Sequence, residues 1–438
     1  MTADPFLAIR VKNRSVECVS AAGVTHADDD PFEVLRVTLS RYRSDTIPDL
    51  PPFQGGAAGY LAYDLNAQLE AVPLSPLDDL RLPDLCVGIY DWVIAWDHES
   101  GDAWLVSTGH PEVGPARARR GAARADAVEE RLSNNVGDWT SAGNLHPALH
   151  GDERGFAIHA VPGASDVFST FSRADYLRAV ARTRDYILAG DIFQANISQR
   201  LERSFERHPF SLYRALARLN PAPFASYFQA GPATVVSASP ERFLRLVDGQ
   251  VETRPIKGTC ARGRTSEEDA RLARALLDSV KDRAENVMIV DVLRNDLSKV
   301  CDDHTVLTPE LCAMETYETV RHLVSTVVGR LRPGLEAVDL MQATFPGGSI
   351  TGAPKIRAME IIAELEPTRR GVYTGAIGYI GFDGTMDTSI AIRTFVVSAG
   401  KATFQVGGGI VADSDPELEY LETLAKAGGL LSALGACT

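Results

Sequence analysis

The chain has 438 residues, of which 45% are hydrophobic and 23% charged. These proportions are typical of globular proteins and exclude the disordered and fibrous classes. The formal net charge of -14 leaves no basic surface for nucleic acid and repels anionic substrates, unless local cations or a metal ion hold them. No apolar run reaches the roughly 18 residues of a membrane span, and the N-terminus lacks the features of a signal peptide. We therefore expect a cytoplasmic protein with no nucleic-acid and no membrane partner.

The first 150 residues are predicted to form a sheet-rich lobe. Short apolar runs at residues 86–96 and 103–107 have the length and composition of strands. The Ala/Arg/Glu-rich stretch at 117–132 is expected to be helical. The polar stretch near residues 133–155 is expected to be a surface linker. A second domain, placed at residues 165–435, follows it.

The C-terminal part mixes strands and helices without regular alternation, which predicts an α+β fold. One helix is expected to begin after Thr265, whose hydroxyl can cap the first turn while Glu268 reaches back, and to resume over residues 281–296. Another is expected to begin near Asp415, with Pro416 at its first position. The expected strands are residues 234–238, 372–382, 391–398 and 402–406.

The six cysteines are far apart and form no Cys-x-x-Cys pair, so neither a disulfide framework nor a zinc site is indicated. They are expected to be reduced and mostly structural. The six are Cys18, Cys86, Cys260, Cys301, Cys312 and Cys437.

Two acidic couples lie on the two expected helices. Asp282 and Glu285 are three residues apart on one, and Glu419 and Glu422 are three apart on the other, so each couple shares a helix face. If the two faces oppose each other, four carboxylates converge, and a set of oxygen ligands suits Mg²⁺. Solvated acids on helix surfaces are the more common explanation of such spacing.

Lys257 stands between a strand-like segment and a turn, beside Gly258. A nucleophilic lysine must be uncharged, and a neighbouring glycine lets a substrate approach the backbone. A surface lysine in a loop is the simpler interpretation. Glu241 could carry protons in the reaction, or it could form a structural ion pair with Arg242.

Two glycine-rich segments, residues 346–355 and 407–409, are expected to be turns that expose backbone N–H groups to anions. The first departs from the nucleotide-binding P-loop because its lysine does not directly follow the last glycine. Four scattered side chains could bind a polar substrate, and Arg393 in particular matches a carboxylate. They are His322, Tyr373, Arg393 and Lys426.

Taken together, these segments resemble the chorismate-utilising enzyme family. The resemblance covers residues 170–430 in order, with a further match at PFQGGAAGY (52–60). It implies two large antiparallel sheets packed as a sandwich with helices outside. The matching segments are AGDIFQ (189–194), SPERF (239–243), PIKGT (255–259), AEN (284–286), VDVLRNDL (290–297), PGGSITGAPK (346–355), IAIRT (390–394) and DSDPELEYLETLAK (413–426).

The resemblance also implies roles for individual residues around chorismate and Mg²⁺. Glu285 and Glu422 would bind the metal directly, and Asp282 and Glu419 would act through water. The enolpyruvyl side of chorismate would meet Tyr373, Arg393, Gly407, Gly408, Gly409 and Lys426. The ring would face Gly258, Thr259, His322 and Ser349, with Lys257 and Glu241 as the catalytic pair.

Within the family, Gln194 stands where the water-adding members have a lysine base, and Lys257 stands where the anthranilate-forming members have alanine. The resemblance therefore implies the branch that makes 4-amino-4-deoxychorismate through a covalent lysine adduct. NPAPFA (220–225) is also closer to this branch, whereas Cys260 departs from its usual arginine.

Ammonia is expected from a separate glutamine amidotransferase subunit, because no Cys/His glutaminase signature is visible in the chain. The alternatives are anthranilate synthesis and an inactive protein that binds chorismate as a sensor.

Overall fold

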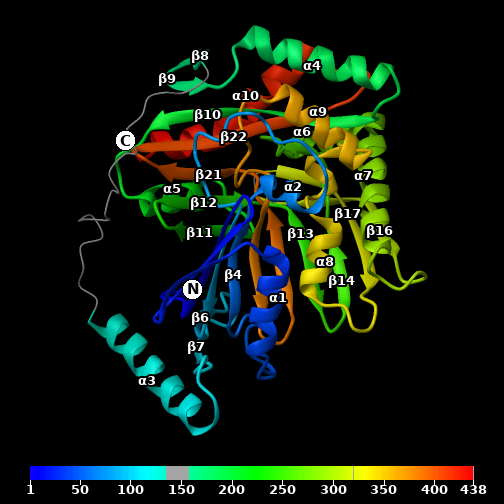
Figure 1. Ribbon diagram of the computed structural model, residues 1–438. Coiled ribbons are helices and arrows are strands. Elements are labelled where there is room, and N and C mark those ends of the chain that lie inside the picture. The colour runs from blue at the N-terminus through cyan, green and yellow to red at the C-terminus, as the bar shows by residue number, and fades with distance from the viewer. Residues whose placement is uncertain (135–156, 319, 438) are drawn as a thin grey trace.

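A computed structural model describes residues 1–134, 157–318 and 320–437 (Figure 1). Its framework consists of two large sheets whose paired strands run antiparallel. In order of pairing, the 12-stranded sheet contains β15 (Ile256–Ala261), β17 (Val320–Arg330), β14 (Gln250–Thr253), β13 (Arg242–Val247), β20 (Met386–Ile390), β19 (Ala376–Gly381), β4 (Gly56–Leu61), β5 (Leu85–Tyr90), β1 (Leu7–Lys12), β2 (Ser15–Ser20) and β3 (Gly23–Ala27), with β16 (Leu307–Thr316) beside β17.

The second sheet is smaller and has eight strands. It contains β11 (Phe224–Ala230), β12 (Ala233–Ser239), β21 (Thr394–Ser398), β22 (Lys401–Ile410), β10 (Gln194–Ser204), β9 (Ala164–Ser169) and β8 (His159–Val161), with β18 (Gly352–Ala353) beside β10. A separate hairpin pairs β6 (Trp92–Trp96) with β7 (Ala103–Ser107).

The helices are α1 (Pro31–Arg41), α2 (Asn66–Leu69), α3 (Gly114–Ser133), α4 (Arg173–Leu188), α5 (Pro209–Leu219), α6 (Ser266–Asp278), α7 (Val280–Ser298), α8 (Ala337–Thr344), α9 (Lys355–Leu365) and α10 (Pro416–Gly435), with 3-10 turns η1 (Tyr63–Leu65) and η2 (Gly348–Ile350). Within the described ranges, none of them combines the length and the apolar composition required for a bilayer crossing.

The two large sheets face each other across a shared apolar cluster. Tyr60 of β4 and Ile377 of β19 pack there with Val235 of β12 and Val396 of β21. The rings of Tyr60 and Phe228 meet edge to face, with centroids 6.0 Å apart. Because these residues come from the two different sheets, the expected α+β sandwich is confirmed.

Helices cover the outer faces of the sandwich (Figure 1). Apolar residues of α1, α7 and α8 complete the core on the 12-stranded sheet. Those of α5 and α10 cover the 8-stranded sheet, and α4 and α9 pack against β10. This arrangement places α7 and α10, the two helices with acidic couples, against different sheets.

Apart from the β6–β7 hairpin, the strands in the first part of the chain join the 12-stranded sheet. β4 pairs with β19 in a register that joins Ala58 to Tyr379, so strands from both parts of the sequence build the 12-stranded sheet. The linker expected near residues 133–155 lies almost entirely outside the described residues. The division into units at 1–150 and 165–435 stays a prediction.

Local signals placed the helix starts well. The Thr265 hydroxyl accepts from the Glu268 N–H at 3.2 Å, but the Glu268 carboxylate accepts from the Arg264 N–H rather than closing the expected box on Thr265. Asp415 accepts from two N–H groups at the start of α10, each at 3.0 Å. The strand expected at 372–382 is shorter, because a turn with Thr374 at φ +60° precedes β19.

Candidate active site

The predicted site residues come from strands of both sheets and from the flanking helices. β15 carries Lys257, Gly258 and Thr259, β17 carries His322, α7 carries Asp282 and Glu285, α10 carries Glu419, Glu422 and Lys426, β22 carries Gly407, Gly408 and Gly409, η2 carries Ser349, and connecting segments carry Glu241, Tyr373 and Arg393.

Lys257 points at Glu285, one of the two acids predicted to bind a metal directly. Its Nζ lies 2.8 Å from Oε1 of Glu285, and the two side chains are only 12% and 13% exposed. Gln194 donates to the same carboxylate oxygen. Burial alone would raise the pKa of Glu285, but the Lys257 charge and the hydrogen bonds from Lys257 and Gln194 hold that pKa below its ordinary value. The predicted nucleophile and one predicted metal ligand therefore meet.

Glu241 is a buried acid suited to proton transfer near neutral pH. Its carboxylate accepts a hydrogen bond of 2.5 Å from the Ser349 hydroxyl. Burial raises the pKa of Glu241 to about 7, although the Ser349 hydrogen bond, the Lys257 charge and the Ile256 backbone lower it in part. Glu241 lies between β12 and β13 and makes no ion pair with Arg242. The Arg242 side chain pairs with Asp387 instead.

His322 is held as a neutral ring. The Thr259 hydroxyl lies 2.7 Å from its Nδ1, across the β15–β17 pairing that sets these two residues opposite each other. Burial, and then the nearby Arg393 charge, lower the pKa of His322 to about 4. At neutral pH this side chain can form hydrogen bonds but brings no positive charge to the substrate.

Arg393 is the cation that the site leaves for a ligand. Among the described residues, no carboxylate lies within ion-pair distance of the Arg393 guanidinium. Burial alone lowers the pKa of Arg393. Its backbone has φ +49°, in the left-handed region that non-glycine residues rarely adopt. Tyr373, in the turn before β19, has a hydroxyl whose pKa burial raises to about 12. A substrate carboxylate would supply the missing partner of Arg393.

The Gly407–Gly409 segment corrects one expectation, because it lies inside β22 instead of forming a turn. Gly408 pairs with Ile197 of β10, and the strand continues to Ile410. Small residues are required for close approach: a Cβ on Gly408 would lie 3.0 Å from the Glu419 carboxylate, and one on Gly409 would lie 2.6 Å from that of Glu285. The glycines thus let α7 and α10 bring their acids over one stretch of strand.

Each acid near these glycines is paired with a lysine. Glu285 pairs with Lys257, Glu422 lies 2.8 Å from Lys426, and Glu419 lies 3.6 Å from Lys281. No three His, Cys, Asp or Glu side chains gather closely enough to hold a metal within the described ranges. Carboxylate oxygens are the kind of ligand that Mg²⁺ prefers. In this arrangement, lysine ammonium groups neutralise the charge of these carboxylates.

Two further predicted residues have other contacts. Lys426 donates to the Gly407 carbonyl at 2.9 Å, which ties α10 to β22. Asp282 packs against Gly258, where an added Cβ would lie 3.1 Å from the aspartate side chain. Gly258 has φ +88°, so the backbone itself favours glycine there. The water-mediated metal roles of Asp282 and Glu419 stay predictions.

The lysine of the first glycine-rich segment is structural. Lys355 is buried and donates to Asp296, to the Thr344 carbonyl at 2.8 Å and to the Pro346 carbonyl at 3.0 Å. Its charge is therefore paired with the Asp296 carboxylate of the protein itself. Ser349 is the residue of this segment that reaches the site.

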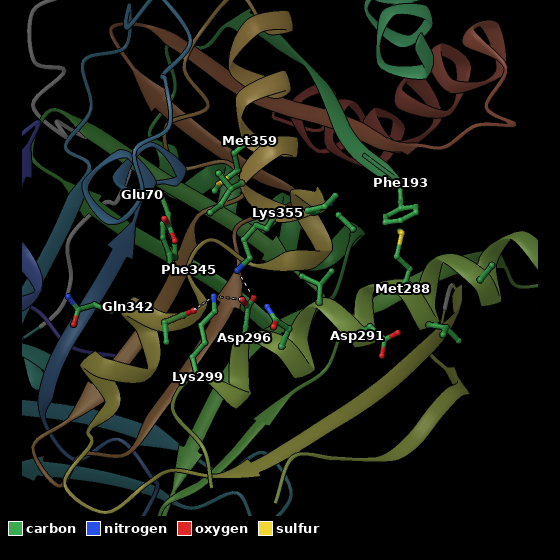
Figure 2. Close-up of a pocket in the computed structure, with 18 of the residues that line it drawn as sticks. Glu70, Phe193, Met288, Asp291, Asp296, Lys299, Gln342, Phe345, Lys355 and Met359 are labelled. Carbon is green, nitrogen blue, oxygen red and sulfur yellow. Dashed lines mark hydrogen bonds and ion pairs between the residues drawn. The ribbon is translucent and has the colours of Figure 1, made fainter. Parts of the chain in front are cut away.

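A large groove of about 1260 Å³ lies on the other side of α7 (Figure 2). It contains none of the predicted site residues, but it borders them: Phe193 precedes Gln194, and Ala284 precedes Glu285. Several apolar side chains stand open at this surface, including Phe193 at 71% and Ile356 at 46% exposure. The groove is therefore adjacent to the acidic end of the site and separate from it.

The chain was compared with known proteins. A family model described as chorismate binding enzyme matches residues 4–432. Aminodeoxychorismate synthase component 1 of Salmonella typhimurium is 38% identical over 99% of this chain and 89% of its own length. Anthranilate synthase component 1 of Thermus thermophilus is 46% identical over 88% of this chain and 79% of its own length.

Among solved structures, anthranilate synthase component I from Streptococcus pneumoniae aligns with a TM-score of 0.82 and 31% identity, over 98% of this chain and 91% of that chain. Sequence relatives of both names thus align with most of the chain, and a solved structure of the second name shares its architecture. With the family model matching nearly from end to end, the chain belongs to the chorismate-binding enzyme family.

Proposed function

We propose that the chain is the chorismate-aminating component I of an aminodeoxychorismate synthase, which makes 4-amino-4-deoxychorismate for 4-aminobenzoate and folate biosynthesis. The observation that carries the proposal is the position of Lys257, largely buried and 2.8 Å from Glu285. A largely buried lysine beside Glu285 is placed to act on a substrate bound at that end of the site. Glu241, with a pKa of about 7, supplies the acid and base that a lysine nucleophile needs.

Chorismate would be held by its two carboxylates. Arg393, which lacks a recorded carboxylate partner among the described residues, would pair with one of them. Mg²⁺ held by Glu285 and Glu422, with Asp282 and Glu419 through water, would supply charge neutralisation for the other. Thr259 and the neutral ring of His322 would form hydrogen bonds at the edge of the ring.

In the first half of the reaction, Lys257 must lose a proton before it attacks. The Glu241 carboxylate, on which the Lys257 charge already acts, is the base we assign to that proton. The amine then bonds to C2 of chorismate, both ring double bonds shift, and the C4–O bond breaks. The departing hydroxide takes the proton from Glu241 and leaves as water, and Glu241 then accepts one proton from the new secondary ammonium.

In the second half, ammonia bonds to C4, the double bonds shift back, and the C2–N bond to Lys257 breaks. The leaving lysine nitrogen receives the proton that Glu241 holds, and the new ammonium at C4 passes one proton to the Lys257 amine, which restores the starting protonation of both side chains. The sum is chorismate plus ammonia giving 4-amino-4-deoxychorismate plus water. Holding both reactants beside Lys257 makes each displacement effectively intramolecular.

A product assay tests the proposal directly. The protein is incubated with chorismate, Mg²⁺ and an ammonium salt, and a lyase that removes pyruvate from 4-amino-4-deoxychorismate is then added. We expect 4-aminobenzoate to form only after the lyase is added. Anthranilate formed without the lyase would instead establish anthranilate synthase component I, the second candidate, which relatives of that name at 46% and 42% identity favour. Chorismate binding without turnover would indicate a sensor.

The groove beside α7 is the surface on which we place the ammonia-supplying glutamine amidotransferase subunit. α7 presents Glu285 to the site and Val287 to the groove, so a subunit seated there would lie next to the end of the site where ammonia is used. The exposed apolar side chains of Phe193 and Ile356 provide the contact area that such a subunit needs.

The variant Ile356→Glu is expected to lower the glutamine-dependent rate of the reconstituted complex by about tenfold or more, because a charge in the apolar contact weakens docking. The ammonium-dependent rate should not change, because Ile356 lies outside the site. Leu307→Glu, at another exposed apolar position, on β16, is the control and should alter neither rate. Equal losses of both rates in Ile356→Glu would rule out the groove as the docking surface of that subunit.

A further inference from the structure

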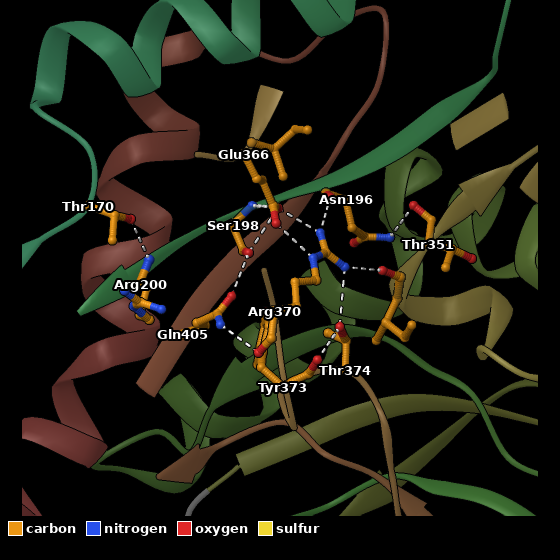
Figure 3. A network of polar contacts seen from close by, with 12 residues as sticks. Thr170, Asn196, Ser198, Arg200, Thr351, Glu366, Arg370, Tyr373, Thr374 and Gln405 are labelled. Carbon is orange, nitrogen blue, oxygen red and sulfur yellow. Dashed lines mark hydrogen bonds and ion pairs between the residues drawn. The ribbon is translucent and has the colours of Figure 1, made fainter. Parts of the chain in front are cut away.

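A fully buried arginine lies behind the candidate site, outside every motif that the sequence singled out. The Arg370 side chain is 1% exposed, and the Glu366 side chain is 3% exposed. Arg370 holds Glu366 with two hydrogen bonds, of 2.7 Å from Nη2 and 2.9 Å from Nε (Figure 3). Burial would lower the pKa of Arg370, but the Glu366 charge outweighs it and keeps the guanidinium ionised.

The remaining N–H groups of Arg370 reach three separate segments (Figure 3). They donate to the Ile350 carbonyl at 3.1 Å, to the Thr374 hydroxyl at 3.3 Å and to the Asn196 carbonyl at 2.7 Å. The guanidinium also lies 5.8 Å from the centre of the Tyr373 ring. One rigid, planar group thus fixes the spacing of three backbone segments that are far apart in the sequence.

Each of those segments supports a residue of the candidate site. Ile350 follows Ser349, whose hydroxyl donates to Glu241. Thr374 follows Tyr373 and donates to its carbonyl at 2.6 Å. Asn196 pairs in β10 with Gly409 of β22.

Glu366 extends the network to the glycine strand. It accepts from both the N–H and the hydroxyl of Ser198, at 2.8 and 2.9 Å, and Ser198 pairs with Gly407. The Gln405 amide donates to the Arg370 carbonyl at 2.8 Å. The Arg370–Glu366 pair is therefore connected to β10, β22, η2 and the Tyr373 turn together.

We propose that Arg370, clamped by Glu366, is a positioning residue for the reaction, which holds Ser349 against Glu241 and Tyr373 against the substrate. It touches no reacting atom. The inference rests on the proposed roles of Glu241 and Tyr373, but not on which amine product is released. A buried ion pair contributes little net stability compared with an apolar pair of equal volume, and positioning gives this costly arrangement a purpose.

The test is Arg370→Lys, measured by chorismate consumption so that either aminated product is counted. A lysine cannot make the five donations, and displacement of the site by about 1 Å costs roughly 100-fold in rate; we expect that loss in kcat. The hydrogen bond from Ser349 lowers the pKa of Glu241, and the charge of Lys257 lowers it as well. A looser Ser349 raises that pKa and should therefore move the acidic limb of the kcat profile to higher pH, in the direction that Ser349→Ala also gives.

The matched control is Arg200→Lys. Arg200 is also buried and also holds a carboxylate with two hydrogen bonds, to Asp79 at 2.9 and 2.6 Å, but those contacts lead away from Glu241 and Tyr373. Arg200→Lys should lower the melting temperature without moving the pH limb of the kcat profile. Glu366→Gln, which keeps the shape of the clamp, serves if Arg370→Lys does not fold, and should move the limb in the same direction by less.

A purely structural role predicts a different result. Arg370→Lys and Glu366→Gln would then melt at lower temperature and, below that temperature, retain wild-type kcat and the wild-type pH profile, which would overturn the proposal. A wild-type protein that consumes no chorismate would count against the proposed function itself, so the two failures are distinguishable.

Discussion

Replacing Lys257 by alanine is expected to reduce formation of 4-amino-4-deoxychorismate by a factor on the order of 10⁴ to 10⁶, the range found when a covalent nucleophile or its essential partner is removed. The physical reason is that the attacking amine lies beside the acidic end of the site, where no other described lysine contacts Glu285. The rate is measured with chorismate and an ammonium salt, with the pyruvate-releasing lyase in excess.

Mass spectrometry gives a readout that does not depend on turnover. Wild-type protein incubated with chorismate and no ammonia should carry an added mass on the peptide that contains Lys257, and Lys257→Ala should not. Lys401→Ala, which removes a lysine paired with Glu202 at 3.5 Å far along β22, is the matched control and should retain both the rate and the adduct. A Lys257→Ala protein with wild-type turnover would exclude the covalent route.

Replacing Glu241 by glutamine is expected to lower kcat by about 10²- to 10⁴-fold, the usual contribution of a positioned general acid. Glutamine keeps the shape and the hydrogen bond from Ser349 but cannot exchange the proton with the leaving hydroxyl. Substrate binding should be little affected, because Arg393 and the metal ligands are untouched.

The pH profile gives the second part of this prediction. The pKa of Glu241 is raised to about 7 by burial, so the carboxylate that must accept the Lys257 proton is present above that pH and is lost as the pH falls through it. Wild-type kcat should therefore fall on the acidic side of neutrality, and this limb should disappear in Glu241→Gln. Glu360→Gln, at a surface carboxylate paired with Arg357, should leave the limb unchanged. Persistence of the limb in Glu241→Gln would assign it to another group.

Features encoded within a few residues of sequence were predicted correctly. The hydroxyl of Thr265 and the carboxylate of Asp415 cap helices where expected, because a cap is satisfied by N–H groups two or three residues away. The hairpin strand at 103–107 was also found with its bounds. Motif chemistry also singled out Lys257, Glu241 and Glu285 as site residues; the structure brings Lys257 and Glu285 together, and the roles of all three stay predictions.

The glycine strand and the buried arginine were not predictable in this way. A run of glycines, considered alone, favours a turn. Gly407–Gly409 nevertheless forms strand, because β10 provides pairing partners more than 200 residues earlier. Glycine is favoured there because the acids of α7 and α10 leave no room for a Cβ. Arg370 pairs locally with Glu366 four residues earlier, but its donations to the Ile350 and Asn196 carbonyls reach 20 and 174 residues along the chain, and no local pattern predicts those.

The sequence by itself determined the family, the fold class and the kinds of chemical group that the site contains, because these follow from local propensities and from residue identities. Only the tertiary structure decided which of those groups meet. It placed Lys257 against Glu285, Ser349 against Glu241 and Arg370 behind all of them. Such contacts depend on strand register and on the packing of two sheets, which no short stretch of sequence specifies.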